Sequence, residues 1–426
     1  MSFTHNGTIL NISFNGIAVL ALAALLMLFG FFLKNRISFL RRYCIPTPVA
    51  SGMLFALLVL ALKKAGVASI VLDTSYQSPF MLAFFATVGL DADLRILRRG
   101  GKDLIKYLLL GVVIATWQNI LAVGGAYLTG IHPMYGVLMG AATQVGGHGG
   151  AAAFGSQLEG MGFAGSTAVG MASATFGVIA GSLLGGPLAR KLINRDRLSS
   201  TETVGALPAL DVENSADRNE DKSPLLEMQE PAHPKEFSLL NTFQILLAVF
   251  ASVMFGSMLC GWITDHLFTF PSTVGAMLFG TLFRNFNDRF HWISLDRTFV
   301  ANFSDTVLNI FLTISIMSMA LEQLASMALP MLLILSLQAI TLGLFAYFVV
   351  YRAMGRDYDA AVMCGGLMGH GLGATPNAVA NIGVLAETYG PSTKALMICS
   401  ITGAFALDLY QLPLDAFVIS LLEKFL

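Results

Sequence analysis

Apolar runs as long as a membrane span recur throughout this chain, and they constrain its fold more than any other feature. Four of them are Ile9–Leu33, Leu104–Leu128, Phe243–Ile263 and Met327–Tyr351. A helix of about 20 residues crosses the roughly 30 Å of hydrocarbon in a bilayer, because each residue adds about 1.5 Å. Charged residues make up 12% of the sequence, about half the share found in a soluble domain. The sequence therefore predicts an all-α polytopic membrane protein.

Several functional classes lack their sequence signals. A net charge of −1 provides no basic surface for a nucleic acid. The four cysteines show no CxxC spacing, and neither HExxH nor GxxxxGK[ST] occurs, so we expect no metal centre, no phosphate-binding loop and no cofactor. No nucleophile–base pair indicates an enzyme, and no ring of like charges indicates a channel. The pattern favours a transporter.

A polar stretch divides the chain into two membrane halves. Residues 194–236 carry scattered charges and prolines and have the composition of a disordered linker between residues 1–193 and residues 237–426. Of the 25 lysines and arginines, all but three fall on one side when the apolar runs are threaded across a bilayer. Basic loops face the cytoplasm. We therefore expect a cytoplasmic linker and both termini on the periplasmic side.

The two halves are predicted to be inverted repeats. The basic loops fit five spans per half, and an odd number places the halves in opposite membrane orientations. The sequence IPTPV at 45–49 resembles FPSTV at 270–274, and each half has a glutamine (Gln118, Gln338) nine residues before a tyrosine. Short apolar matches also arise by chance, but their shared order favours a duplication.

The string Gly-His-Gly occurs once in each half, at 147–149 and 369–371. Each copy lies among clustered glycines that interrupt apolar sequence, and Pro376 follows the second. Broken helices persist in a bilayer only where their backbone lines a cavity or packs against protein. We therefore predict one re-entrant hairpin with a glycine-rich tip per half, an arrangement that marks the substrate site of secondary transporters. Close helix packing is the alternative role of such glycines, and it explains their polar neighbours less well.

Polar residues at the two tips form the candidate site. Hydroxyl, amide and imidazole groups can hydrogen-bond an anionic substrate, as can the backbone amides of helix N-termini. The predicted substrate-binding residues are Thr143, Gln144, Gly147, His148, Gly149, Gly369, His370, Gly371, Thr375, Asn377, Asn381 and Asp408. Carbonyl and side-chain oxygens suit a hard cation such as Na⁺. The predicted Na⁺ ligands are Gln118, Asn119, Gly146, Thr175 and Gly373.

Asp408 and the two histidines each admit two roles. Asp408 is predicted near the middle of the last span, 395–422, where an unpaired carboxylate is costly. It holds a substrate ammonium or a cation, or it forms a salt bridge or hydrogen bond inside the bundle. Each imidazole contacts substrate or ties its tip to a backbone carbonyl. Asp91 and Asp93, beside Arg95 near a membrane boundary, are expected to form solvated ion pairs.

Several blocks of this sequence resemble the sodium/glutamate symporter family. They are IPTPVA at 45–50, PFMLAFFATVGL at 79–90, GGHG at 146–149, ATFG at 174–177, LASMALP at 324–330, YDAAV at 358–362 and GLGATP at 371–376. The resemblance extends over nearly the whole chain.

The resemblance implies a Na⁺-coupled importer of L-glutamate in the bacterial inner membrane. It also implies a homodimer embedded in lipid, in which a transport unit moves like an elevator against a fixed scaffold. In this interpretation Asp408 meets the ammonium group of glutamate. The alternative is a carrier of the same build, driven by Na⁺ or H⁺, for a dicarboxylate or hydroxycarboxylate. Asp408 favours an amino acid, because a simple dicarboxylate needs no acidic partner.

Overall fold

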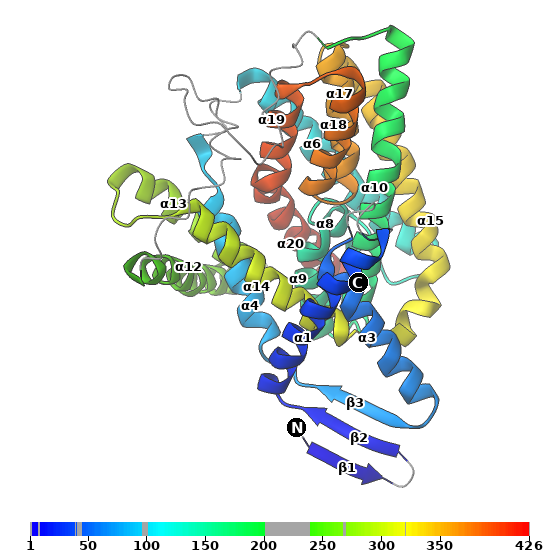
Figure 1. Cartoon of the computed structure of the whole chain (residues 1–426), viewed down its shortest axis with the longest axis vertical. Helices are drawn as coiled ribbons and strands as arrows, with labels where there is room; N and C mark the ends of the chain where they lie inside the picture. Colours follow the sequence, from blue (N-terminus) through cyan, green and yellow to red (C-terminus); the bar gives the residue numbers. More distant parts are fainter. Residues whose placement is uncertain are drawn as a thin grey trace.

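A computed structural model of the chain describes residues 2–6, 9–38, 40, 45–95, 101–200, 239–266, 270–319 and 321–425. Long helices make up most of these residues (Figure 1). The helices of the first half are α1 (Gly16–Arg36), α3 (Thr47–Lys64), α4 (Gln77–Asp91), α6 (Gly101–Leu128), α7 (Pro133–Val137), α8 (Ala141–Gln144), α9 (Gly147–Gly160) and α10 (Ser166–Asp196). Helix α10 extends three residues beyond residue 193, where the first membrane half was predicted to end. Residues 201–236 of the predicted linker lie outside the described residues.

The second half repeats this order of elements. Its helices are α12 (Leu239–His266), α13 (Ser272–Phe290), α14 (Arg297–Met317), α15 (Leu321–Phe345), α16 (Tyr351–Ala353), α17 (Tyr358–Leu372), α18 (Thr375–Tyr389), α19 (Thr393–Ile401) and α20 (Asp408–Phe425). Two short π-helical segments, η1 (Ala346–Val350) and η2 (Thr402–Ala406), follow α15 and α19. In each half, three helices are followed by a fourth of at least 25 residues, a broken segment at the Gly-His-Gly string, and a last helical segment.

The described chain is mainly helical, as predicted, but a small three-stranded sheet means that it is not all-α. Strands β1 (Ser2–Asn6) and β2 (Ile9–Phe14) are antiparallel, and β2 pairs in parallel with β3 (Ala68–Leu72). The sheet lies at one end of the molecule, at the bottom of Figure 1. The apolar run from Ile9 therefore begins as a strand. Helix α1 starts only after Asn15, whose side-chain oxygen accepts a hydrogen bond from the Ala18 amide at 3.0 Å.

Seven described helices are long and apolar enough to cross a membrane, and the bent pair α19–η2 and α20 raises the number to eight. The prediction was ten. Helix α4 has only 15 residues, and α13 carries Arg284, Asp288 and Arg289 in its second half. Both helices occupy places in the element order where a span was expected. That α4 and α13 span the membrane, which would complete the predicted count of ten, therefore stays a prediction.

The helices pack as two units, and each unit takes helices from both halves. One, the frame, contains α1, α3 and α4 with α12, α13 and α14. The other, the tip unit, contains α6–α10 with α15–α20. Backbone contacts within each unit are dense and those between the units are fewer. Apolar side chains of the two units also share two hydrophobic clusters. Both Gly-His-Gly strings belong to the tip unit.

Packing inside the frame is reciprocal between the halves. Gly89 of α4 lies so close to α13 that a side chain would collide with the Met277 carbonyl. Correspondingly, a Cβ at Gly52 of α3 would lie 3.0 Å from the Ile316 side chain of α14. The second helix of each half thus packs on the third helix of the other half.

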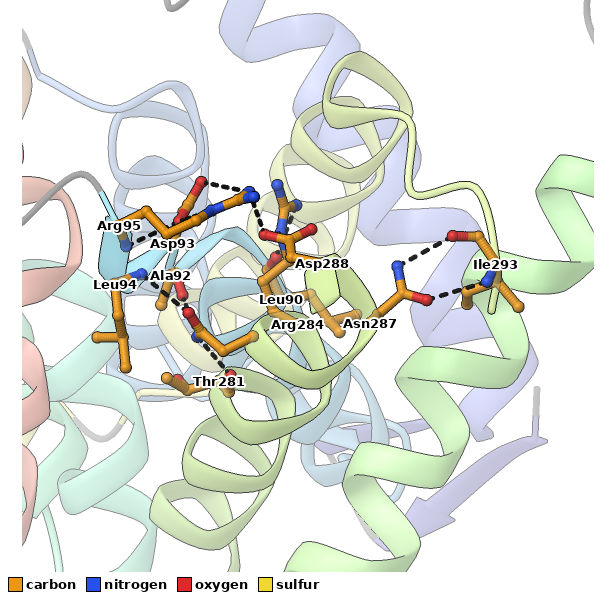
Figure 2. Close-up of polar contacts among 11 residues, drawn as sticks. Leu90, Ala92, Asp93, Leu94, Arg95, Thr281, Arg284, Asn287, Asp288 and Ile293 are labelled. Atoms are coloured by element: carbon orange, nitrogen blue, oxygen red, sulfur yellow. Dashed lines mark hydrogen bonds and ion pairs between the residues drawn. The ribbon is translucent and has the colours of Figure 1, made fainter. Parts of the chain in front are cut away.

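Charged side chains join α4 and α13 at one end of the frame (Figure 2). Arg95 donates from Nε to Asp93 Oδ1 and from Nη2 to Asp93 Oδ2, both at 3.0 Å, and Nη2 also reaches Asp288. Arg284, which is buried, donates to Asp288 Oδ2 at 3.0 Å and to the Leu90 carbonyl at 3.3 Å. The predicted Asp93–Arg95 pair is present, but the Asp93 side chain is only 4% exposed. The expectation of a solvated pair was wrong for Asp93.

Candidate substrate and ion site

The second tip is a tight helical hairpin. Helices α17 and α18 are separated only by Gly373 and Ala374. They are antiparallel, because Gly369 lies against the backbone of Ala378 and Gly365 against the Leu385 side chain. Pro376 is tolerated because it stands in the first turn of α18, where its missing N–H has no helical partner.

The first tip is built differently. Two short helices, α7 and α8, precede α9, which begins at Gly147 with a φ of +56°. Glycine adopts this left-handed conformation without strain. Thr143 supports the turn by donating its hydroxyl to the Leu138 carbonyl at 3.0 Å. The predicted helix–tip–helix arrangement is therefore broken into several short pieces.

The two tips meet in the interior of the tip unit. A Cβ at Gly147 would lie 3.0 Å from the Gly373 carbonyl oxygen, so the tip backbones lie close together. Gln118 Nε2 of α6 donates to the Gly371 carbonyl at 2.7 Å. Gln338 of α15 donates to the Gln118 carbonyl at 2.8 Å and to the Met139 carbonyl, next to the first tip, at 3.3 Å. Each glutamine thus binds the tip region of the opposite half.

Three predicted site amides bind backbone carbonyls of α10. Asn377 Nδ2 donates to Val178 O at 3.0 Å, and Asn381 Nδ2 donates to Gly181 O and Gly365 O, both at 3.1 Å. Gln144 Nε2 donates to Ser173 O at 3.1 Å. These amides therefore hold both tips against α10, and their hydrogen-bond donors already have protein partners.

The two histidines are buried and bind protein hydroxyl groups. His148 Nε2 lies 3.1 Å from Thr175 Oγ1. Because the Thr175 hydroxyl donates to its own helix, the imidazole is the donor. His370 Nε2 lies 2.8 Å from the Tyr107 hydroxyl. His370 Nδ1 has no hydrogen-bond partner among the described residues. Gly149, the remaining predicted residue of the first tip, packs against Phe84.

The segment that carries Asp408 passes both tips. A side chain at Gly403 would meet Thr375 Oγ1 of the second tip at 2.9 Å, and a Cβ at Gly146 of the first tip would lie 3.1 Å from Gln411 Oε1. Asp408 lies between Gly403 and Gln411. It was predicted near the middle of an unbroken span, but it is the first residue of α20, after a bend of 41°. Its half-buried carboxylate makes no hydrogen bond or ion pair with the described residues.

A second buried acid, Asp415, is absent from the sequence prediction. Its side chain is fully buried. Asn119 Nδ2 donates to Asp415 Oδ1 at 2.6 Å, and Gln411 Nε2 donates to Asp415 Oδ2. Asn119 Oδ1 in turn accepts from the Ala141 amide at 2.8 Å, at the start of α8. One sequence signal could have pointed to Asp415. Its spacing from Asp408 and Gln411 places all three residues on one helical face.

The site offers unpartnered groups for both a cation and an anion. Some buried side-chain oxygens around the tips accept no hydrogen bond from the described residues; these are Gln118 Oε1, Gln144 Oε1, Ser173 Oγ, Gln338 Oε1, Thr402 Oγ1 and Gln411 Oε1. Such oxygens fit a hard cation. No side chain caps the N-terminus of α9 or α18, where backbone amides favour negative charge. The described residues contain no cluster of three or more His, Cys, Asp or Glu side chains that could hold a metal ion.

A polytopic membrane protein with two broken helical segments that meet in its interior belongs to the class of secondary transporters. A profile of the family "Sodium/glutamate symporter" matches residues 12–391. The sodium/glutamate symporter of Escherichia coli (strain K12) is 36% identical over 394 residues, which cover 92% of this chain and 94% of the relative. That of Haemophilus influenzae is 33% identical over 404 residues, with 94% and 96% covered. This chain is a member of the sodium/glutamate symporter family.

Proposed function

We propose that this protein imports L-glutamate together with Na⁺ across the bacterial inner membrane. The observation that carries the proposal is that the two glycine-rich tips meet next to the segment of Asp408, whose carboxylate has no partner among the described residues. The curated relatives that match over more than nine-tenths of the chain are named sodium/glutamate symporters. No enzymatic step is needed for this function.

Glutamate has two carboxylates and one ammonium, and the site has a counterpart for each. The uncapped N-termini of α9 and α18 bind the carboxylates through backbone amides, supported by the polar groups of the tips. Asp408 binds the ammonium group. A dicarboxylate or hydroxycarboxylate would leave Asp408 unpaired in the membrane interior, which is costly. The unpaired acid therefore favours glutamate over these alternative substrates.

Na⁺ is the coupling ion and is transported as a second substrate. Oxygens around the first tip, among them the carbonyls near Gly146, bind it in this proposal. Its charge makes the pocket more favourable for anionic glutamate. Each charge that enters the cell contributes roughly 2.3 kcal/mol per 100 mV of membrane potential.

The order of elements and the exchange of contacts between the halves support an inverted repeat with two re-entrant hairpins. The basic loops support periplasmic termini and a cytoplasmic linker. Backbone contacts are fewer between frame and tip unit than within each, which supports an elevator movement, in which the tip unit carries the substrate past the frame. The frame is also where we place the contact of a homodimer within the lipid bilayer.

The test is uptake of radiolabelled L-glutamate into proteoliposomes under an inward Na⁺ gradient, with choline as the control cation. We expect uptake only with Na⁺. Asp408→Asn should reduce kcat/KM for glutamate by at least about tenfold, because the loss of one close charge pair exceeds about 1.4 kcal/mol in a dry site. Absence of uptake with either cation would overturn the proposal. Competition by malate or citrate, but not by aspartate, would favour the alternative substrates.

A further inference from the structure

Asp415 is the most completely buried acid of the tip unit, and the described residues provide it with no cationic partner. None of the ion pairs between described residues includes it. Its partners are two neutral amide groups, from Asn119 and Gln411. An ionised carboxylate in such a place is costly unless a positive charge joins it. An ionised Asp415 therefore needs a cation next to it, and the described residues do not supply one.

The surroundings of Asp415 supply further ligands for a cation. A carboxylate has about four lone-pair sites, of which the two amides occupy two. Gln411 is fully buried, and its Oε1 atom has no donor among the described residues. This oxygen faces the first tip, since a Cβ at Gly146 would lie 3.1 Å from it. An unpartnered oxygen and a carboxylate thus stand side by side next to the tip backbone.

Burial separates the roles of the two acids on α20. Asp408 is only partly buried and starts α20, between Gly403, which lies near the second tip, and Gln411, which lies near the first. Asp415 lies two helical turns further along and is closed off from solvent. An amino acid cannot reach a carboxylate that is covered in this way, whereas a single small ion can be enclosed by it.

We propose that Asp415 is the carboxylate that neutralises the coupling Na⁺, with Gln411 Oε1 as a further oxygen ligand. This inference rests on the proposed function. It assigns the ion to α20 and the first tip, whereas glutamate occupies the space between the tips and Asp408. Because Asn119 connects Asp415 to the first residue of α8, ion binding and the conformation of the first tip are coupled.

The experiment measures Na⁺ binding to the purified protein by thermal unfolding, with choline replacing Na⁺ at constant ionic strength. A ligand that binds only the folded state raises Tm as its concentration increases. In wild-type protein we expect a saturable rise with Na⁺. Asp415→Asn should raise the Na⁺ concentration for half-maximal effect at least about tenfold, and Asp415→Glu should recover part of the loss because it restores the charge.

Two further variants keep the proposal testable if Asp415→Asn does not fold. Gln411→Met removes the unpartnered oxygen at similar volume and should raise the half-maximal Na⁺ concentration by about threefold. The matched control is Ser420→Ala, at another buried residue of α20. This variant should leave the half-maximal Na⁺ concentration unchanged.

The outcomes separate the inference from the proposed function. An Asp415→Asn protein with lower Tm but an unchanged half-maximal Na⁺ concentration would make Asp415 structural and overturn the inference alone. A wild-type protein without any Na⁺ effect on Tm and without Na⁺-dependent uptake would overturn both. A shift of the Na⁺ requirement in the variants, with glutamate KM at saturating Na⁺ changed much less, is the expected result.

Discussion

Asn119 connects the ion site to the first tip through the two ends of one amide. Its Nδ2 donates to Asp415, and its Oδ1 accepts from the Ala141 amide. Asn119→Ala would leave both groups buried and short of a partner. We expect a loss of roughly 2–6 kcal/mol in the free energy of unfolding, because each of the two unsatisfied buried groups costs about 1–3 kcal/mol.

The measurement is denaturant or thermal unfolding of the detergent-purified protein. Thr129→Ala is the control, since the Thr129 hydroxyl only bonds carbonyls of its own helix at the exposed end of α6. An Asn119→Ala variant as stable as the control would show that water or a shifted side chain replaces the amide.

Some residues that the structure brings together at the candidate site could be proposed from the sequence, and others could not, for a physical reason. Clustered glycines and Gln118–Asn119 stand out in apolar sequence, because polar groups inside a membrane need a function or a partner. Asp415 was missed because its meaning depends on Asn119, which lies 296 residues away. No local pattern reports such a partner. Likewise, the hydrogen bonds of Asn377 and Asn381 to α10 could not be read from their spacing.

At the scale of elements, the junction of α4 and α13 depends on Asp93. Burial raises the pKa of Asp93, but hydrogen bonds and charge from Arg95 outweigh this effect, so its pKa lies below the ordinary value. A lowered pKa stabilises the folded state fully above the unfolded pKa of about 3.9, and this contribution is lost as the pH falls from that value through the lower pKa of the folded state. Asp93→Asn should therefore lower stability by about 1 kcal/mol at pH 7, a modest loss because Arg95 is largely exposed.

The check is Tm of wild type and Asp93→Asn between pH 7 and pH 3. The difference between the two proteins should be constant near neutral pH and shrink below about pH 4. Asp265→Asn, at an exposed residue near the end of α12, should show no such difference. A gap between wild type and Asp93→Asn that persists undiminished at pH 3 would mean that the Asp93 charge does not stabilise the junction.

The sheet shows where prediction of elements fails. An apolar run of this length favours a helix throughout, and α1 does occupy most of it. Strand β2 forms because Leu10–Phe14 pair with residues 68–72, beyond α1 and α3. Strands β2 and β3 can pair only because α1 and α3, which lie between them in the sequence, bring the two segments together in space. Helix periodicity therefore cannot reveal it.

At the scale of the whole molecule, the two halves contribute to both the frame and the tip unit. A repeat of the two halves is predicted from short echoes in the sequence and from the two Gly-His-Gly strings, and the similar order of elements agrees with it. The division into frame and tip unit could not, because it depends on which helices pack across the halves. This division has a mechanical consequence. A movement that carries the tips past the frame must break the contacts between the frame and the tip unit.

One of these contacts provides a test. Gln77 of α4 donates to Ser156 Oγ of α9 at 2.6 Å, so a residue of the frame touches a residue of the tip unit. Gln77→Cys/Ser156→Cys, joined by a short bifunctional thiol reagent, should abolish glutamate uptake, and cleavage of the linker should restore it. Thr116→Cys/Tyr410→Cys is the matched control, because its hydroxyl groups lie 2.8 Å apart within the tip unit.

Both pairs are made in a background in which the native cysteines are replaced by alanine; these are Cys44, Cys260, Cys364 and Cys399. The linked control should still transport, since its two helices move together. The linked Gln77/Ser156 protein should keep its Na⁺-dependent rise in Tm, because binding does not require the units to separate. If that protein transports at the unlinked rate with the link verified by mass spectrometry, the tip unit does not move against the frame at α4, and the elevator proposal fails there.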